Sequence, residues 1–119
     1  MTLEQIAIKH KTQKVPHGYM PIYERHFELM RGEVIDLVEI GVANGASLRT
    51  WGEYFSKGWV TGLEKDSKSV IDFNNTNNHL LNNCFTIECD ASDKDSLDSA
   101  IGDDPVDIII DDGSHWAHE

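Results

Sequence analysis

The chain has 119 residues, with 21 Asp and Glu against 10 Lys and Arg, which gives a formal net charge of −11. This length accommodates one domain with a hydrophobic core of its own. The negative charge repels nucleic-acid phosphates and anionic membrane surfaces, so we expect neither as a partner. No apolar run approaches membrane-spanning length and the first residues do not read as a signal peptide, so we expect a cytoplasmic location.

Two short helices are expected before the first strand. Apolar residues at helical spacing predict the first helix over residues 2–9. The second runs from Pro21 to about Met30 and begins on a residue that suits the first helical position. We therefore expect an N-terminal helical segment over residues 1–32, followed by a domain over residues 33–119.

From residue 34 onward, short apolar strands alternate with helices. The expected strands cover residues 34–40, 59–63, 85–88 and 106–110, and the expected helices cover residues 46–55, 68–81 and 93–101. The last of these helices begins on Asp93, which suits a cap. This alternation favours a parallel sheet with right-handed crossovers, so the fold class is α/β.

The two cysteines of the chain lie close to the third expected strand. Cys84 and Cys89 are an odd number of positions apart, and side chains alternate between the faces of a sheet. The spacing therefore predicts that the two thiols point to opposite faces and form no disulfide, as expected for a reducing compartment.

The most informative segment is residues 39–47, where an apolar strand ends in Glu39 and a turn containing Gly41 and Gly45. A strand that brings a carboxylate and a glycine-rich turn to one point is typical of α/β domains that bind nucleoside-containing cofactors. Dinucleotide-binding folds use Gly-x-Gly-x-x-Gly, whereas this pattern is Glu-x-Gly-x-x-x-Gly. The acid beside the glycines disfavours a pyrophosphate and favours a phosphate-free cofactor with a ribose, an ammonium and a sulfonium.

Acidic residues also follow the other three expected strands. Ligands of parallel α/β sheets bind beyond the carboxyl ends of the strands, so these acids are candidate binding residues. Asp66 also suits a helix cap and Asp90 a turn cap, and both alternatives stay open. The acids in chain order are Glu39, Glu64 with Asp66, Asp90, and Asp111 with Asp112.

These motifs resemble the class I S-adenosylmethionine-dependent methyltransferases. Within them, the chain is most similar to the metal-dependent sugar O-methyltransferases of macrolide biosynthesis and their relatives labelled cephalosporin hydroxylases. The resemblance implies a Rossmann-like parallel sheet in the order 3-2-1-4. This sheet is the N-terminal half of a seven-stranded fold, of which we expect the given sequence to contain only the first four strands. It rests on five segments: His17-Gly18-Tyr19, Tyr23-Glu24-Arg25, and residues 39–47, 62–66 and 107–115.

The resemblance also implies a role for each candidate residue. Carboxylate oxygen is a preferred ligand of Mg²⁺, and histidine suits a general base near neutral pH. The implied roles are Glu39, Gly41 and Gly45 as the wall under the methionine and ribose, Glu64 or Asp66 as the ribose acceptor, Asp90 and the Ala91 backbone at the adenine, Asp111 near the reacting methyl, Asp112 as a Mg²⁺ ligand, and His115 as the general base.

The leading hypothesis is an S-adenosylmethionine-dependent methyltransferase domain that acts on a hydroxyl of a sugar or another small molecule with divalent-metal assistance. Two alternatives stay open: a non-catalytic module that binds S-adenosylmethionine or S-adenosylhomocysteine, and a fragment of an NAD-type oxidoreductase. In the implied order the fourth strand is an edge, with Val106, Ile108 and Ile110 exposed to pairing, so we expect a homo-oligomer formed through that edge.

Overall fold

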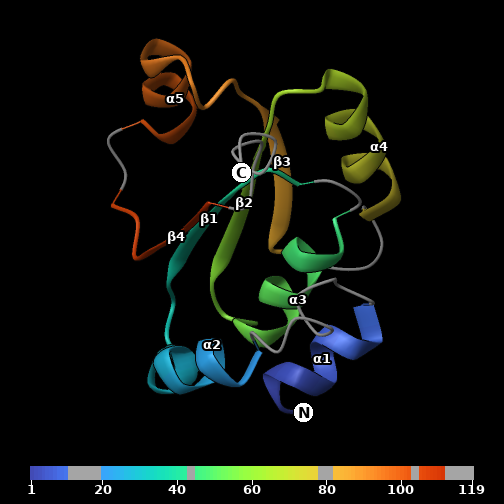
Figure 1. Ribbon diagram of the computed structural model, residues 1–119, viewed down its shortest axis with the longest axis vertical. Coiled ribbons are helices and arrows are strands. Elements are labelled where there is room, and N and C mark those ends of the chain that lie inside the picture. The colour runs from blue at the N-terminus through green and yellow to red at the C-terminus, as the bar shows by residue number, and fades with distance from the viewer. Residues whose placement is uncertain (11–19, 43–44, 78–81, 103–104, 112–119) are drawn as a thin grey trace.

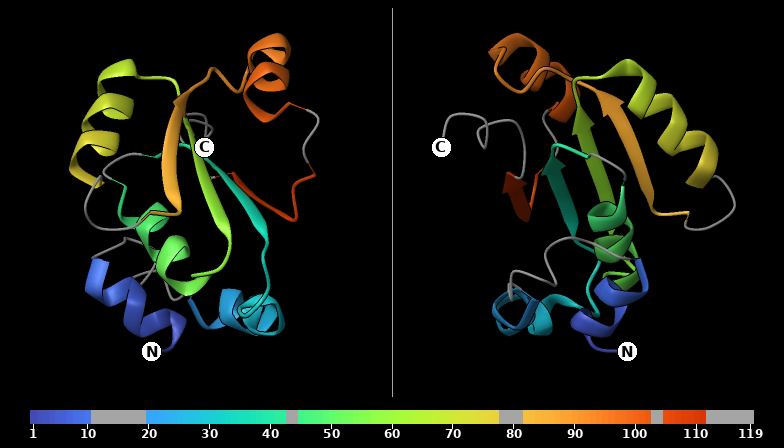
Figure 2. Two further views of the ribbon diagram at one scale, coloured as in Figure 1. Left: turned by 180° about the vertical axis from the view of Figure 1, so that it is seen from behind. Right: turned by 45° about the vertical axis from the view of Figure 1, so that its right-hand side comes forward.

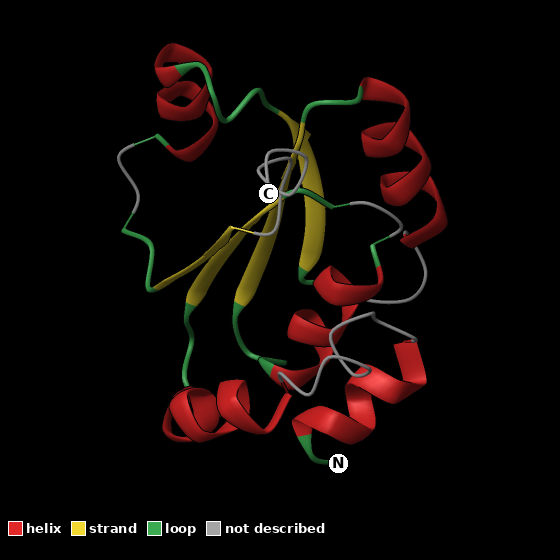
Figure 3. Cartoon of the chain, viewed as in Figure 1, coloured by secondary structure: helices red, strands yellow, loops and turns green. Residues whose placement is uncertain are grey.

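The computed structural model of the chain is a four-stranded parallel sheet with helices on both faces (Figures 1 and 3). It describes residues 1–10, 20–42, 45–77, 82–102 and 105–111. The strands are β1 (Asp36–Ile40), β2 (Trp59–Glu64), β3 (Cys84–Glu88) and β4 (Ile108–Asp111). The helices are α1 (Leu3–His10), α2 (Met20–Phe27), the 3₁₀ turn η1 (Glu28–Met30), α3 (Ala46–Tyr54), α4 (Ser67–Asn77) and α5 (Lys94–Ile101).

The strand order is β3-β2-β1-β4 and every pairing is parallel, which confirms the α/β fold and the order expected from the sequence. Ile40 of β1 is level with Leu63 of β2 and with Asp111 of β4. The carboxyl ends of the strands therefore lie along one edge, far from α1 and α2 in Figure 2. Among the described strands, β4 pairs only with β1, and association through its outer edge stays a prediction.

The sheet separates two apolar layers, and Figure 2 shows α4 and α5 on opposite sides of it. The larger layer joins α1, α3 and α4 to the sheet through residues such as Leu3, Trp51 and Phe73. The smaller layer lies under α5 and includes Val38 and Leu63. Cys84 belongs to the larger layer and Cys89 to the smaller, and both are free, so the predicted orientation of the two thiols is confirmed.

Most element boundaries agree with the expected ones within two residues. The second helix is shorter than expected, because α-helical geometry ends at Phe27 and a 3₁₀ turn continues to Met30. Asp93 caps α5 as expected, since its side chain accepts a hydrogen bond from the Asp95 backbone N–H. None of the helices in the described ranges is long and apolar enough to cross a membrane.

Helix α4 protects the outer edge of β3 through one asparagine. The Asn74 side-chain amide donates to the Thr86 carbonyl at 3.1 Å, and its oxygen accepts from the Thr86 N–H at 2.9 Å. These two bonds replace the pairing that a neighbouring strand would provide, so they reduce the tendency of this edge to pair with another chain.

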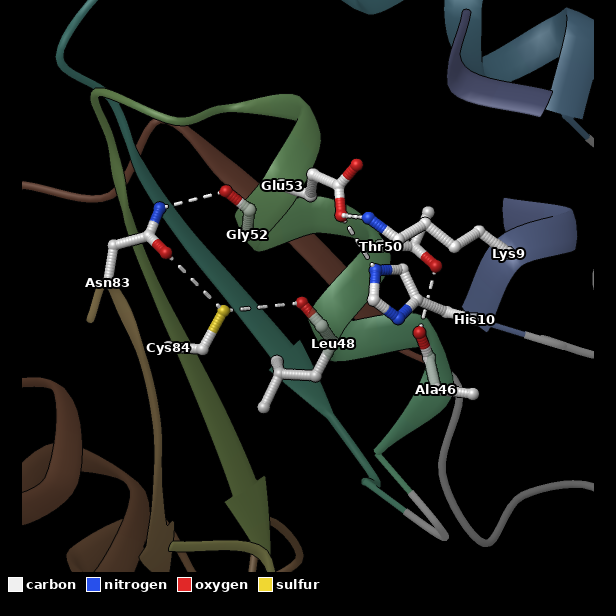
Figure 4. A network of polar contacts seen from close by, with 9 residues as sticks. All are labelled: Lys9, His10, Ala46, Leu48, Thr50, Gly52, Glu53, Asn83 and Cys84. Carbon is white, nitrogen blue, oxygen red and sulfur yellow. Dashed lines mark hydrogen bonds and ion pairs between the residues drawn. The ribbon is translucent and has the colours of Figure 1, made fainter. Parts of the chain in front are cut away.

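Asn83, directly before β3, holds the C-terminal end of α3 (Figure 4). Its buried side-chain NH₂ donates to the carbonyls of Gly52 at 2.9 Å and of Phe55 and Gly58 at 3.1 Å. The last carbonyls of a helix have no partner within the helix, so this side chain satisfies them inside the protein.

Replacing Asn83 with alanine should lower the free energy of unfolding by about 2–3 kcal/mol, since it leaves buried carbonyls without their donor. Urea denaturation measures this loss. The matched control is Asn75→Ala, at an exposed position of α4, which should leave the denaturation midpoint nearly unchanged. Equal midpoints for the two variants would show that Asn83 does not carry this role.

Helix α1 is joined to α3 by an ionic cluster on Glu53 (Figure 4). The Glu53 carboxylate lies 2.9 Å from Lys9 Nζ and 3.1 Å from His10 Nε2. Burial by itself would raise the pKa of Glu53, but hydrogen bonds and charge attraction from Lys9 and His10 outweigh it and hold the pKa below its ordinary value. A carboxyl with a depressed folded-state pKa stabilises the fold above its unfolded pKa, and this contribution disappears as the pH falls through the folded value.

Glu53→Gln should therefore destabilise the protein by about 1 kcal/mol at pH 7, and the difference from the unmodified chain should shrink toward pH 3. Thermal unfolding at a series of pH values measures both quantities. Asp98→Asn is the control, because it removes a carboxylate from an exposed ion pair: the side chains of Lys94 and Asp98 are 86% and 62% exposed. A pH-independent effect of Glu53→Gln would contradict the ionic origin of the contact.

Candidate functional site

The acids and glycines singled out in the sequence converge at the carboxyl edge of the sheet. The turn after β1 lies beside the end of β2, since the Gly41 N–H donates to the Leu63 carbonyl at 2.8 Å. The end of β2 is in turn joined to the segment after β3, where the Cys89 N–H donates to the Glu64 carbonyl at 2.9 Å. These two backbone hydrogen bonds join the ends of β1, β2 and β3 into one surface, and β4 ends level with β1 at the same edge.

Gly41 and Gly45 both adopt the left-handed backbone conformation, with φ values of +88° and +83°. Side chains rarely tolerate this conformation, which explains glycine at both ends of the turn. The Gly45 N–H donates to the Val42 carbonyl at 2.9 Å, and the Gly45 carbonyl accepts from the Arg49 N–H at 3.0 Å at the beginning of α3. The backbone thus turns from a strand into a helix within a few residues.

Glu39 lies inside the protein, below this turn. It is 0% exposed, and its Oε2 accepts hydrogen bonds from Ser47 Oγ at 2.8 Å and from Trp51 Nε1 at 3.2 Å. Ser47 and Trp51 are four residues apart and therefore lie on the same side of α3. The carboxylate faces α3, so it supports the turn from below and offers no exposed surface to a ligand.

Glu64 ends β2 and is half-buried. Its Oε1 accepts the Val42 N–H at 3.0 Å and its Oε2 accepts the Asp66 N–H at 2.9 Å. One carboxylate therefore accepts hydrogen bonds from the backbone of both the turn after β1 and the loop after β2. Asp66 lies beside it and is exposed.

Asp66 and Asp90 both accept local hydrogen bonds, as expected for the helix cap and the turn cap that the sequence analysis kept as alternatives for them. The Asp66 carboxylate accepts from Ser69 Oγ at 2.8 Å at the beginning of α4, and this bond is the main cause of a lowered pKa of Asp66. The Asp90 carboxylate accepts from the Ser92 hydroxyl at 2.6 Å and the Ser92 N–H at 3.0 Å, which lower the pKa of Asp90. Ala91 lies within this turn, half-buried.

Several candidate positions fall outside what the structure describes. Asp112 and His115 lie outside the described residues, as do His17 and Tyr19. Asp111 is the last residue of β4, level with Ile40 at the same edge. Within the described residues, no group of three or more His, Cys, Asp or Glu side chains is arranged to hold a metal ion.

Some supporting residues carried no clear signal in the sequence. No local pattern marks Ser47 or Trp51 as a partner of Glu39, and only the packing of α3 on β1 brings both side chains to its carboxylate. Gly62 had a signal, because glycine inside a strand marks a close approach. A Cβ at Gly62 would lie 2.6 Å from Val42 Cγ2, so the side chain of the turn occupies the space that this glycine leaves.

The comparisons with known proteins give a consistent result, although no protein-family model matches the chain. It is 38% identical over 122 residues to the 8-demethyl-8-alpha-L-rhamnosyl tetracenomycin-C 2'-O-methyltransferase of Streptomyces olivaceus, covering 95% of this chain and 30% of that protein. It is 34% identical over 123 residues to the mycinamicin VI 2''-O-methyltransferase of Micromonospora griseorubida, covering 95% of this chain and 29% of that protein.

Solved structures agree with these relatives. The MycE methyltransferase of the mycinamycin biosynthetic pathway, in complex with Mg, SAH and mycinamycin VI, matches 98% of this chain with a TM-score of 0.73 and 30% identity. A second structure of it, with Mg and SAH, matches 99% with a TM-score of 0.74. In both cases the chain covers 29% of the solved structure, so it spans about 30% of the length of the proteins that it resembles.

Replacing Ser47 with alanine should lower the free energy of unfolding by about 1.5–3 kcal/mol, because it removes a donor to a buried carboxylate. Chemical denaturation measures the loss. Ser99→Ala, at an exposed position of α5, removes the same hydroxyl from a helix and should cost nothing. If both variants unfold at the denaturant concentration of the unmodified chain, the Glu39 contact does not stabilise α3.

Proposed function

Since the chain is homologous to macrolide and sugar O-methyltransferases over about 30% of their length, we propose that it forms the cofactor-binding part of an S-adenosylmethionine-dependent O-methyltransferase. The acceptor class that we propose is a sugar hydroxyl or the hydroxyl of another small molecule. The observation that carries the proposal is the Glu64 carboxylate, which lies at the end of β2 and accepts the Val42 N–H beside the glycine turn.

The chemistry of this edge fits a nucleoside without phosphates. A carboxylate has about four lone-pair positions, so the two backbone bonds of Glu64 leave room for ribose hydroxyls. Asp66 is a second candidate for the ribose, and Asp90 with the Ala91 backbone for the adenine. The acids would repel a pyrophosphate at the same place, which disfavours the alternative of an NAD-type oxidoreductase.

The remaining roles concern the reacting end of the cofactor. We propose Gly41 and Gly45 as the surface under the methionine and ribose, with Glu39 as the buried support of that surface. Asp111 at the end of β4 is proposed near the methyl group, in line with its place at the same edge.

S-adenosylmethionine, when bound, supplies a methyl group on a sulfonium. The proposed base is His115, whose imidazole would accept the proton of the acceptor hydroxyl while the methyl carbon passes from sulfur to the hydroxyl oxygen and S-adenosylhomocysteine leaves with the sulfur electron pair. Asp112 is proposed as a Mg²⁺ ligand on the strength of its motif. Among the described residues, no group of three or more His, Cys, Asp or Glu side chains is arranged to complete such a site.

A second function class is a module that binds S-adenosylhomocysteine without turnover. The observation that fits it is the Glu64 carboxylate beside the glycine turn, which would serve cofactor binding whether or not turnover follows. Methyl transfer by the chain, lost in His115→Ala, would exclude this second class.

Calorimetry separates the remaining possibilities. We expect S-adenosylhomocysteine to bind the chain and NAD⁺ to give no heat of binding. Glu64→Gln should weaken S-adenosylhomocysteine about tenfold, because one charge-assisted hydrogen bond contributes about 1.5 kcal/mol.

The matched control for Glu64→Gln is Glu88→Gln. Glu88 ends the neighbouring strand β3, level with Glu64, and its side chain is exposed, so the variant removes the same charge from the same edge. Equal losses of affinity in both variants would show that the loss of one negative charge at this edge, and not a hydrogen bond from Glu64 to the ligand, causes the effect. Binding of NAD⁺ in place of S-adenosylhomocysteine would overturn the proposal.

A further inference from the structure

The glycine turn after β1 packs against the unit formed by β2 and α4 at two places where a glycine is required. A Cβ at Gly62 of β2 would lie 2.6 Å from Val42 Cγ2, as noted above. A Cβ at Gly45 would lie 2.4 Å from Cδ2 and 2.6 Å from Cε2 of the Phe73 ring. All three distances are shorter than non-bonded carbon atoms tolerate, so the Phe73 ring lies directly against the backbone of Gly45.

Phe73 comes from the middle of α4 and is only 4% exposed. The Arg49 guanidinium lies 4.9 Å from the centre of its ring, and the Arg49 N–H donates to the Gly45 carbonyl at 3.0 Å. A single aromatic ring on α4 therefore contacts the last residue of the turn and a side chain from the first turn of α3. Contacts of this kind restrict a backbone that glycine alone leaves free.

The same α4 follows directly from the loop that carries Glu64 and Asp66. Phe73 thus joins the backbone of the glycine turn to the helix that begins at the proposed ribose loop. We propose that Phe73 is a positioning residue, which sets the glycine turn relative to the Glu64 loop so that both contact one cofactor. This inference rests on the proposed function, since the ligand that would contact both segments is S-adenosylhomocysteine or S-adenosylmethionine.

The test compares two Phe→Leu variants by calorimetry with S-adenosylhomocysteine. Phe73→Leu should raise the Kd about tenfold, which corresponds to a turn that holds its binding arrangement in about a tenth of the molecules. Phe55→Leu is the matched control: Phe55 is 0% exposed, follows α3 at the end away from the turn, and packs against Phe27 and Tyr54. It should lower the thermal midpoint comparably and leave the Kd unchanged. Equal Kd changes in the two variants would overturn the proposal.

A double-mutant cycle tests the contact itself. Gly45→Ala should weaken S-adenosylhomocysteine strongly, because its methyl group meets the ring. Adding Phe73→Ala removes the ring and should recover part of that affinity. The fold increase in Kd of the double variant should therefore be smaller than the product of the fold increases of the two single variants. Multiplicative effects would show that Phe73 and Gly45 act independently and would overturn the proposal.

Amide hydrogen exchange, measured without ligand, separates this inference from the proposed function. The exchange of the Gly45 N–H, which donates to the Val42 carbonyl, should be faster in Phe73→Leu than in Phe55→Leu. If the unmodified chain binds no S-adenosylhomocysteine, the proposed function fails, while faster exchange still supports positioning of the turn by Phe73. If exchange is the same in both variants, the positioning role fails whatever the ligand result.

Discussion

A carboxylate buried between β1 and α3 determines how the first strand and the first helix of the sheet meet. Removing a carboxylate from water costs several kcal/mol unless hydrogen bonds replace the water. Glu39 receives such bonds from Ser47 and Trp51, which lie on one side of α3. The helix has to present that side to the strand, so the direction of α3 and the place of the glycine turn follow from this one requirement.

The turn itself is held by the neighbouring strand and helix. Glu64 accepts the Val42 N–H, Gly62 makes room for the Val42 side chain, and Phe73 covers Gly45. These contacts belong to one continuous unit, β2 with α4, so the loops after β1 and β2 form a single surface. The candidate site depends on this docking, because a ligand that spans both loops needs them at a constant separation.

Two acids at this edge of the sheet accept hydrogen bonds from their own local backbone and serine hydroxyls. Asp66 and Asp90 have lowered pKa values because local hydroxyl and backbone donors stabilise their carboxylates. Both residues therefore favour the ionised form while they cap the segments that follow them. Structural capping and ligand binding are compatible roles for the same carboxylate, since each oxygen has more than one acceptor position.

The sequence alone was sufficient for the α/β class, the alternation of elements, the Asp93 cap and the opposite faces of Cys84 and Cys89, because each follows from backbone periodicity or from neighbouring residues. The family motifs added the strand order, and the glycine spacing is one basis of the cofactor that we propose. The roles proposed for Asp112 and His115 depend on those motifs alone.

Only the tertiary structure decided what the supporting side chains do. Asn83 binds carbonyls of Gly52, Phe55 and Gly58, which precede it by 25 to 31 residues, and no local pattern encodes these partners. The contact between Phe73 and Gly45 and the inward direction of Glu39 depend in the same way on how helices cross the sheet. Local sequence specifies which way a backbone turns, whereas burial and hydrogen-bond partners arise when segments distant in sequence pack together.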